Sequence, residues 1–66
     1  MKSYVVGHID FFNNELVLER IEANTWQEAL AAHSKCEDMF DPMPDTLEDA
    51  KEAAFDQDAM IAVLEL

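Results

Sequence analysis

The chain has 66 residues, half of them apolar, and its fifteen Asp and Glu against four Lys and Arg give a net charge of −11. This apolar content suffices for one small core, which excludes a disordered polyanion, and the charge excludes direct binding to nucleic acid or to an anionic membrane surface. Cys36 is the single cysteine, so no intramolecular disulfide is possible.

Two strands are expected at the start of the chain. Residues 3–11 are rich in β-branched and aromatic types, and residues 15–23 show the same character. Between them lie Asn13 and Asn14, and paired Asn residues tolerate the positive φ angles of tight hairpin turns. The first third of the sequence therefore predicts a β-hairpin.

A helix is expected to follow over residues 25–39. Thr25 and Glu28 have the spacing of a capping box, in which each side chain satisfies a backbone donor at the helix start. The helix should end before Pro42, because proline disfavours helical backbone in the residue before it. Its predicted apolar face comprises Trp26, Ala29, Leu30, His33, Cys36 and Phe40. Within this face, Trp26 is expected to pack in the core rather than against a partner.

A second helix is predicted over residues 46–57, with Asp45 and Thr46 as capping residues and acids in its first turn. Leu47, Ala50 and Ala54 share its apolar side. Residues 60–66 then carry apolar side chains at both odd and even positions, which is typical of a strand with little exposed face.

The sequence thus predicts one α+β domain, residues 1–66, in the order β-β-α-α-β. We expect a three-stranded sheet with both helices on one face and the third strand beside the first. The two free sheet edges make a homodimer possible. Because residues 1–6 pass directly into strand-like sequence without a charged segment leading a long apolar stretch, we expect a cytoplasmic protein.

Chemistry-bearing residues are few. With one Gly, the chain has no glycine-rich phosphate loop. His33, Cys36 and Glu37 could begin a metal site on adjacent helical turns, but no second ligand pair occurs, so we expect His33 and Cys36 on a half-buried face. His8 is expected at a cross-strand or surface position. The prediction is a non-catalytic protein without cofactor or metal.

Residues 37–58 contain nine acids and only one basic residue, Lys51. At about 100° per residue, five of the acids fall on one side of the second helix, opposite Leu47. They form either a solvated face that confers solubility or a DNA-mimicking surface that binds a basic cleft on another protein. The predicted contacts are Asp45, Glu48, Asp49, Glu52 and Asp56, extended by Glu37, Asp38 and Asp41, with Met43 as an exposed apolar contact.

The layout of a hairpin that ends at residues 21–30 (Ile-Glu-Ala-Asn-Thr-Trp-Gln-Glu-Ala-Leu), followed by helix and a closing strand, resembles small acidic phage-encoded proteins that inhibit host RNA polymerase, restriction enzymes or CRISPR complexes. The resemblance implies a stoichiometric inhibitor, acting in the host cytoplasm, that occludes a nucleic-acid-binding host protein. Two alternatives remain open. One is a small homodimeric structural or assembly protein, and the other is an antitoxin or immunity protein that neutralises a basic nuclease.

Overall fold

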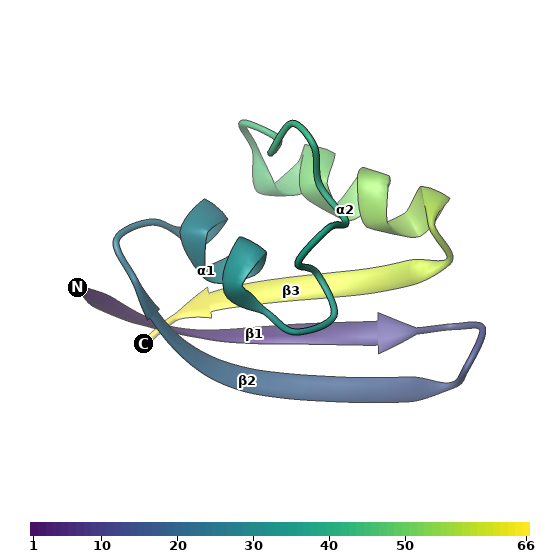
Figure 1. The fold of residues 1–66 in the computed structure, drawn as a ribbon, viewed down its shortest axis with the longest axis horizontal. Coiled ribbons are helices and arrows are strands. Elements are labelled where there is room, and N and C mark those ends of the chain that lie inside the picture. The colour runs from purple at the N-terminus through teal and green to yellow at the C-terminus, as the bar shows by residue number, and fades with distance from the viewer.

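The computed structural model describes residues 1–66 and contains three strands and two helices (Figure 1). Strand β1 lies at the centre of one antiparallel sheet of order β2-β1-β3, so the predicted place of the third strand beside the first is confirmed. The predicted α+β fold of order β-β-α-α-β is also confirmed. The elements are β1 (Lys2–Asp10), β2 (Glu15–Ala23), α1 (Trp26–Ala32), α2 (Leu47–Asp56) and β3 (Ala59–Glu65).

The hairpin turn between β1 and β2 is stabilised by its own polar side chains. Asn14 has a φ of 52°, as expected of an Asn in a tight turn. The Asp10 carboxylate accepts the backbone N–H groups of Phe12 at 2.9 Å and of Asn13 at 3.2 Å. These bonds fix the register in which Asp10 lies opposite Glu15.

Helix α1 begins where the capping pattern predicts. The Thr25 hydroxyl accepts the N–H of Glu28 at 3.2 Å, and the Glu28 carboxylate accepts the N–H of Asn24 at 2.9 Å. The predicted end at residue 39 is wrong, because α1 stops at Ala32 after seven residues and residues 34–39 form turns.

Contacts with β2 explain why α1 is short. After Ala32 the backbone of His33 is extended, and the ring Nε2 lies 3.2 Å from the carbonyl oxygen of Val17. The next residue, Ser34, donates its N–H to the Glu19 carboxylate at 2.9 Å and also donates its hydroxyl to it. Two bonds to a charged acceptor and one to a buried carbonyl replace the helical bonds that a longer α1 would have formed.

The core lies between the sheet and the two helices, which pack on the same side of it (Figure 1). Its members alternate along β1 and β3, as the two-residue period of a strand requires. The buried apolar residues are Tyr4, Val6, Ala23, Ala29, Leu30, Cys36, Ala50, Ala54, Ala59, Ile61 and Val63.

The opposite side of the sheet has no covering layer, and this corrects the expectation for the last strand. In β3, Ala59, Ile61 and Val63 are buried, whereas Met60, Ala62 and Leu64, which alternate with them, are exposed. β3 is therefore apolar on both faces but is buried on only one of them.

Candidate partner-binding surface

Helix α2 carries the predicted contact residues, and its bounds lie within one residue of the prediction at each end. The Thr46 hydroxyl accepts the N–H of Asp49 at 3.2 Å and so caps the helix. Glu48 and Asp49 lie in the first turn, where the helix dipole favours negative charge. Asp56 lies in the last turn, where the dipole opposes it, and no basic residue is there to compensate.

Small side chains determine which side of α2 faces the sheet. Ala50 and Ala54 are completely buried, and Leu47 is partly buried beside them. Because alanine has only one methyl group, the helix axis can come close to β3, the strand that α2 contacts. The rotation of the helix is thereby fixed, and the opposite side points to solvent.

Four carboxylates occupy that outward side. Glu48, Asp49, Glu52 and Asp56 are all exposed, and at 100° per residue they fall within one arc opposite Ala50. These four residues are called the acidic face of α2 from here on. The structure therefore places together four of the five acids that were predicted to share one side of the helix.

No basic group neutralises the acidic face of α2. The close acid–base contacts are Lys2 with Glu65 at 3.5 Å, Lys35 with Glu15 at 3.0 Å, and His33 with Glu19 at 3.6 Å, all of them away from α2. Lys51 is exposed on the same helix but forms no ion pair. The acidic face therefore projects its full negative charge into solvent.

The remaining predicted acids lie outside the helix. Asp45 is exposed but precedes the cap, so the helix does not set its direction. Glu37 and Asp38 are exposed on the turns that follow α1, and the carbonyl of Met39 in these turns accepts the side-chain amide of Gln57 at 3.0 Å. This bond holds Glu37 and Asp38 near the carboxyl end of α2, where they line a shallow depression with Gln57.

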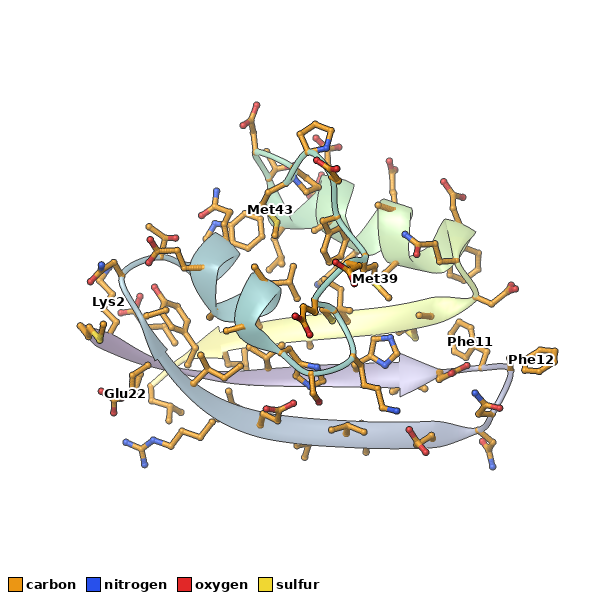
Figure 2. All side chains as sticks on the ribbon, in the orientation of Figure 1. Lys2, Phe11, Phe12, Glu22, Met39 and Met43 are labelled. Atoms are coloured by element: carbon orange, nitrogen blue, oxygen red, sulfur yellow. The ribbon has the colours of Figure 1, made fainter.

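Asp41 is exposed in the connection between the helices, before a cis peptide bond to Pro42. Met43, in contrast, is partly buried against the core together with Met39 (Figure 2). The prediction of Met43 as an exposed apolar contact is therefore wrong, because the short α1 leaves the connecting residues to cover the core.

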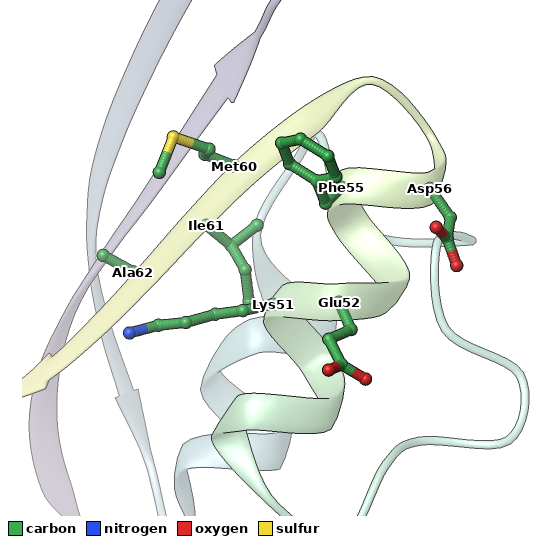
Figure 3. Close-up of a pocket in the computed structure, with 7 residues that line it drawn as sticks. All are labelled: Lys51, Glu52, Phe55, Asp56, Met60, Ile61 and Ala62. Atoms are coloured by element: carbon green, nitrogen blue, oxygen red, sulfur yellow. The ribbon is translucent and has the colours of Figure 1, made fainter.

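The largest hollow of the surface is an open groove of about 630 Å³ between α2 and β3. Phe55 and the aliphatic chain of Lys51 reach from α2 toward β3, while the carboxylates of Glu52 and Asp56 point to the other side of the helix (Figure 3). Phe55 also meets Phe11 edge to face, with ring centroids 6.1 Å apart. No nucleophile–base pair lines this groove.

The histidines and the cysteine are more deeply buried than expected. His33 and Cys36 are essentially inaccessible, which corrects the half-buried face predicted for them. His8 lies opposite Val17 and Ile61 on the central strand and is buried, so of its two predicted positions the cross-strand one is observed and the surface one is not. The His33 Nδ1 accepts the N–H of Lys35 at 3.1 Å, so Nε2 carries the hydrogen and donates it to Val17. No three His, Cys, Asp or Glu side chains are grouped to hold a metal ion.

Burial and hydrogen bonding change the titration of several of these groups. Burial raises the pKa of the Cys36 thiol to about 11. Burial, and to a lesser degree the neighbouring His33, lowers the pKa of His8, whose Nε2 has no hydrogen-bond partner. Hydrogen bonds from Ser34 hold the pKa of Glu19 below its usual range. These groups serve the packing of α1 on the sheet.

Sequence reasoning missed the uncovered side of the sheet. Leu16 and Leu18 of β2 point outward, while Glu15 and Glu19 of the same strand point toward the helices and bind Lys35 and Ser34. The available signal was the first half of β2, residues 15–19, in which the two leucines have the opposite parity to Glu15 and Glu19.

No protein-family model, curated protein or solved structure gives a match to this chain. Neither helix has the length and apolar character needed to cross a bilayer.

Proposed function

We propose that this protein is a non-catalytic inhibitor of the DNA-mimic type that binds a basic surface of a nucleic-acid-handling protein through the acidic face of α2. The observation that supports this most directly is that four exposed carboxylates lie on one side of a helix and none of them has a basic partner. An unneutralised row of this kind destabilises its own helix, and a basic partner would supply the missing counter-charges.

The spacing of the charges suits a surface that binds phosphates. Eight residue rises separate Glu48 from Asp56, so the acidic face of α2 extends over about 12 Å, or about 4 Å per charge. Successive phosphates of one DNA strand are about 3.4 Å apart along the axis. A cleft whose Lys and Arg side chains match a phosphate backbone therefore meets carboxylates at a similar average density, with individual axial steps of about 1.5 to 6 Å.

The net charge supports fast association with such a cleft. A body with a charge of −11 attracts a basic surface over about one Debye length, which is about 8 Å at physiological salt. Steering of this kind raises association rates and is lost as salt increases. Glu37 and Asp38, held near the carboxyl end of α2, would extend the region of negative electrostatic potential.

The state of the chemistry-bearing residues supports a non-catalytic role. Both ring nitrogens of His33 are engaged in hydrogen bonds within the core. Cys36 is buried with a raised pKa, whereas a nucleophilic cysteine needs access and a lowered one. The hollow between α2 and β3 is an open groove rather than an enclosed site.

The test is affinity capture of nucleic-acid-binding proteins, followed by titration of the purified target. Capture should succeed at low salt, be competed by added DNA or RNA, and fail at high salt. The variant Glu48→Gln, Glu52→Gln, Asp56→Asn should bind about 3- to 150-fold more weakly, since each exposed ion pair contributes about 0.2–1 kcal/mol.

A matched control separates the acidic face of α2 from net charge alone. The variant Glu15→Gln, Glu22→Gln, Glu65→Gln removes the same number of negative charges, three, from the sheet and should retain the affinity for the target. If the α2 variant binds as tightly as the unmodified protein, the carboxylates confer solubility only and the proposal is wrong. Identification of the target as a basic nuclease encoded beside this protein would indicate the antitoxin alternative.

A further inference from the structure

The side of the sheet that faces away from the helices is apolar and uncovered. Leu16, Leu18 and Leu64 are 59%, 64% and 65% exposed, and Met60 is 51% exposed. The surface, called the open sheet face, consists of Val5, Gly7, Ile9, Leu16, Leu18, Met60, Ala62 and Leu64.

In the first half of β2, residues 15–19, leucines take the place of the polar side chains that a water-facing strand carries outward. An antiparallel sheet with one wet side carries polar residues outward and apolar residues inward. In β2, Glu15 and Glu19 point inward to Lys35 and Ser34, and Leu16 and Leu18 point outward. Ile21 and Ala23 in the second half of β2 pack inward against the core, and Arg20 and Glu22 lie on the outer side. The exposed hydrocarbon of β2 is therefore confined to its first half, where it faces the side without a layer, as in a sheet whose second layer comes from outside the chain.

We infer that a second copy of this chain covers the open sheet face, so that two sheets pack face to face in a symmetric dimer. Charge favours this arrangement over other homodimers. The chain carries −11, yet the only charged side chains that the three strands place on this side of the sheet are Arg20 and Glu22, which have opposite signs. The acidic face of α2 lies on the helix side, so contact through the open sheet face keeps the acidic helices of the two copies apart.

The shape of the open sheet face suits self-association. A hollow of about 170 Å³ is lined by Gly7 and Ala62 at its floor and by the longer Leu16, Leu18 and Met60 around it. Leu18 lies over Gly7, in the space that a side chain there would take: an added Cβ would come to 2.9 Å from the Leu18 Cδ2. In a two-fold dimer each hollow meets the protruding side chains of the other copy, and packed sheets at about 10 Å interdigitate in this way.

The area predicts a weak dimer. A fully exposed large aliphatic side chain offers about 100 Å² of apolar surface, so the exposed fractions of the open sheet face give about 300 Å² per copy. The exposed side chains of Arg20 and Glu22 at its rim raise the area to about 500 Å² per copy. The total of about 1,000 Å² is at the lower limit of specific interfaces. We therefore expect dissociation constants of about 10 to 100 μM.

Sedimentation equilibrium tests the inference with the full chain from about 1 μM to about 1 mM, at about 0.15 M and about 1 M salt. We expect a reversible dimer that tightens at the higher salt, because screening removes the repulsion between two copies of charge −11. This salt dependence is opposite to that expected for the basic partner of α2, so the two proposals fail independently.

The variant Leu16→Thr, Leu18→Thr, Leu64→Thr should weaken the dimer at least tenfold. Threonine has a high strand propensity, and the three leucines are exposed in the monomer, so the fold should be retained. Phe55→Gln is the control, because it removes an exposed apolar side chain from α2 and should leave the dimer unchanged. In the unmodified protein, the methyl NMR signals of Leu16 and Leu18 should shift with concentration, which gives a readout that needs no variant.

A chain that stays monomeric at about 1 mM in both salts overturns the inference. A dimer that the threonine variant forms as tightly as the unmodified protein also overturns it and indicates pairing through a strand edge. A monomer whose open sheet face binds an unrelated protein shows that the cover is not a second copy.

Discussion

Glu52 lies at the centre of the acidic face of α2, and its replacement by Gln should stabilise the protein. Its like-charged neighbours on the helix surface are Glu48 and Asp49 in the preceding turn and Asp56 in the following one. Like charges three or four residues apart cost about 0.2–0.5 kcal/mol each. Three such pairs disappear in Glu52→Gln, so the expected gain is about 1 kcal/mol. Glu and Gln have similar helix propensities, which leaves the charge as the only difference.

Thermal unfolding measures this gain. For a domain of this size about 1 kcal/mol raises the Tm by about 4–8 °C. The increase should be present at low salt and largely vanish at about 1 M salt, where the Debye length is about 3 Å. Glu22→Gln serves as control, since it removes the same charge from β2, where Glu22 and Arg20 both bind the Ser3 hydroxyl and no acidic row exists. A Tm that does not rise at low salt, or a rise that persists unchanged at high salt, would refute the view that α2 gives up stability for its charge.

Three further predictions concern the core. Leu30→Ala should cost about 2–5 kcal/mol in urea unfolding, because Leu30 is completely buried, whereas Leu18→Ala at an exposed position should change the free energy of unfolding much less. His8 has a folded-state pKa below its unfolded value of 6.5, so the unfolded chain binds the proton more readily; stability should fall as pH drops below about 6.5, and His8→Leu should remove this dependence from urea midpoints. Cys36, with a pKa of about 11, should react with a thiol reagent at pH 8 only as fast as the protein unfolds, and immediate reaction would contradict its burial.

The elements that the sequence predicts best depend on local chemistry. The capping residues Thr25 and Thr46 mark the helix starts, and Asn14 adopts the positive φ that its type tolerates. Each of these signals acts within a few residues of chain. For α2, the alternation of small apolar and acidic residues also predicts the direction in which its carboxylates point.

The early end of α1 could not be predicted in this way, because its cause is distant in sequence. Ser34 binds Glu19, and His33 binds Val17, across fifteen and sixteen residues respectively. The helical spacing of Cys36 and Phe40 persists in the sequence beyond Ala32, but both residues reach the core from turns and irregular backbone. Residue spacing alone does not distinguish burial on the face of a helix from burial on turns and irregular backbone.

The open sheet face was not predicted, because the apolar pattern of β3 is compatible with burial on both sides of the sheet or on one side only. A strand with apolar residues of both parities is expected when layers cover both sides of a sheet. β3 shows this pattern, but the chain supplies helices for one side only. Counting the available layers, rather than reading the strand by itself, reveals that one side has no cover within the chain.

The two proposed surfaces can be occupied at the same time, because they lie on different sides of the molecule. A dimer formed through the open sheet face leaves both acidic faces of α2 free. Its charge, twice the −11 of one chain, then steers the association of the dimer with a basic target. A target with two basic sites would bind the second acidic face at an effective concentration set by the rigid dimer, and such pairing can raise affinity by about 10²- to 10⁴-fold without a new contact. Weak dimerisation would thus make inhibition depend steeply on the concentration of the inhibitor, because the bivalent form accumulates only above the dissociation constant of the dimer.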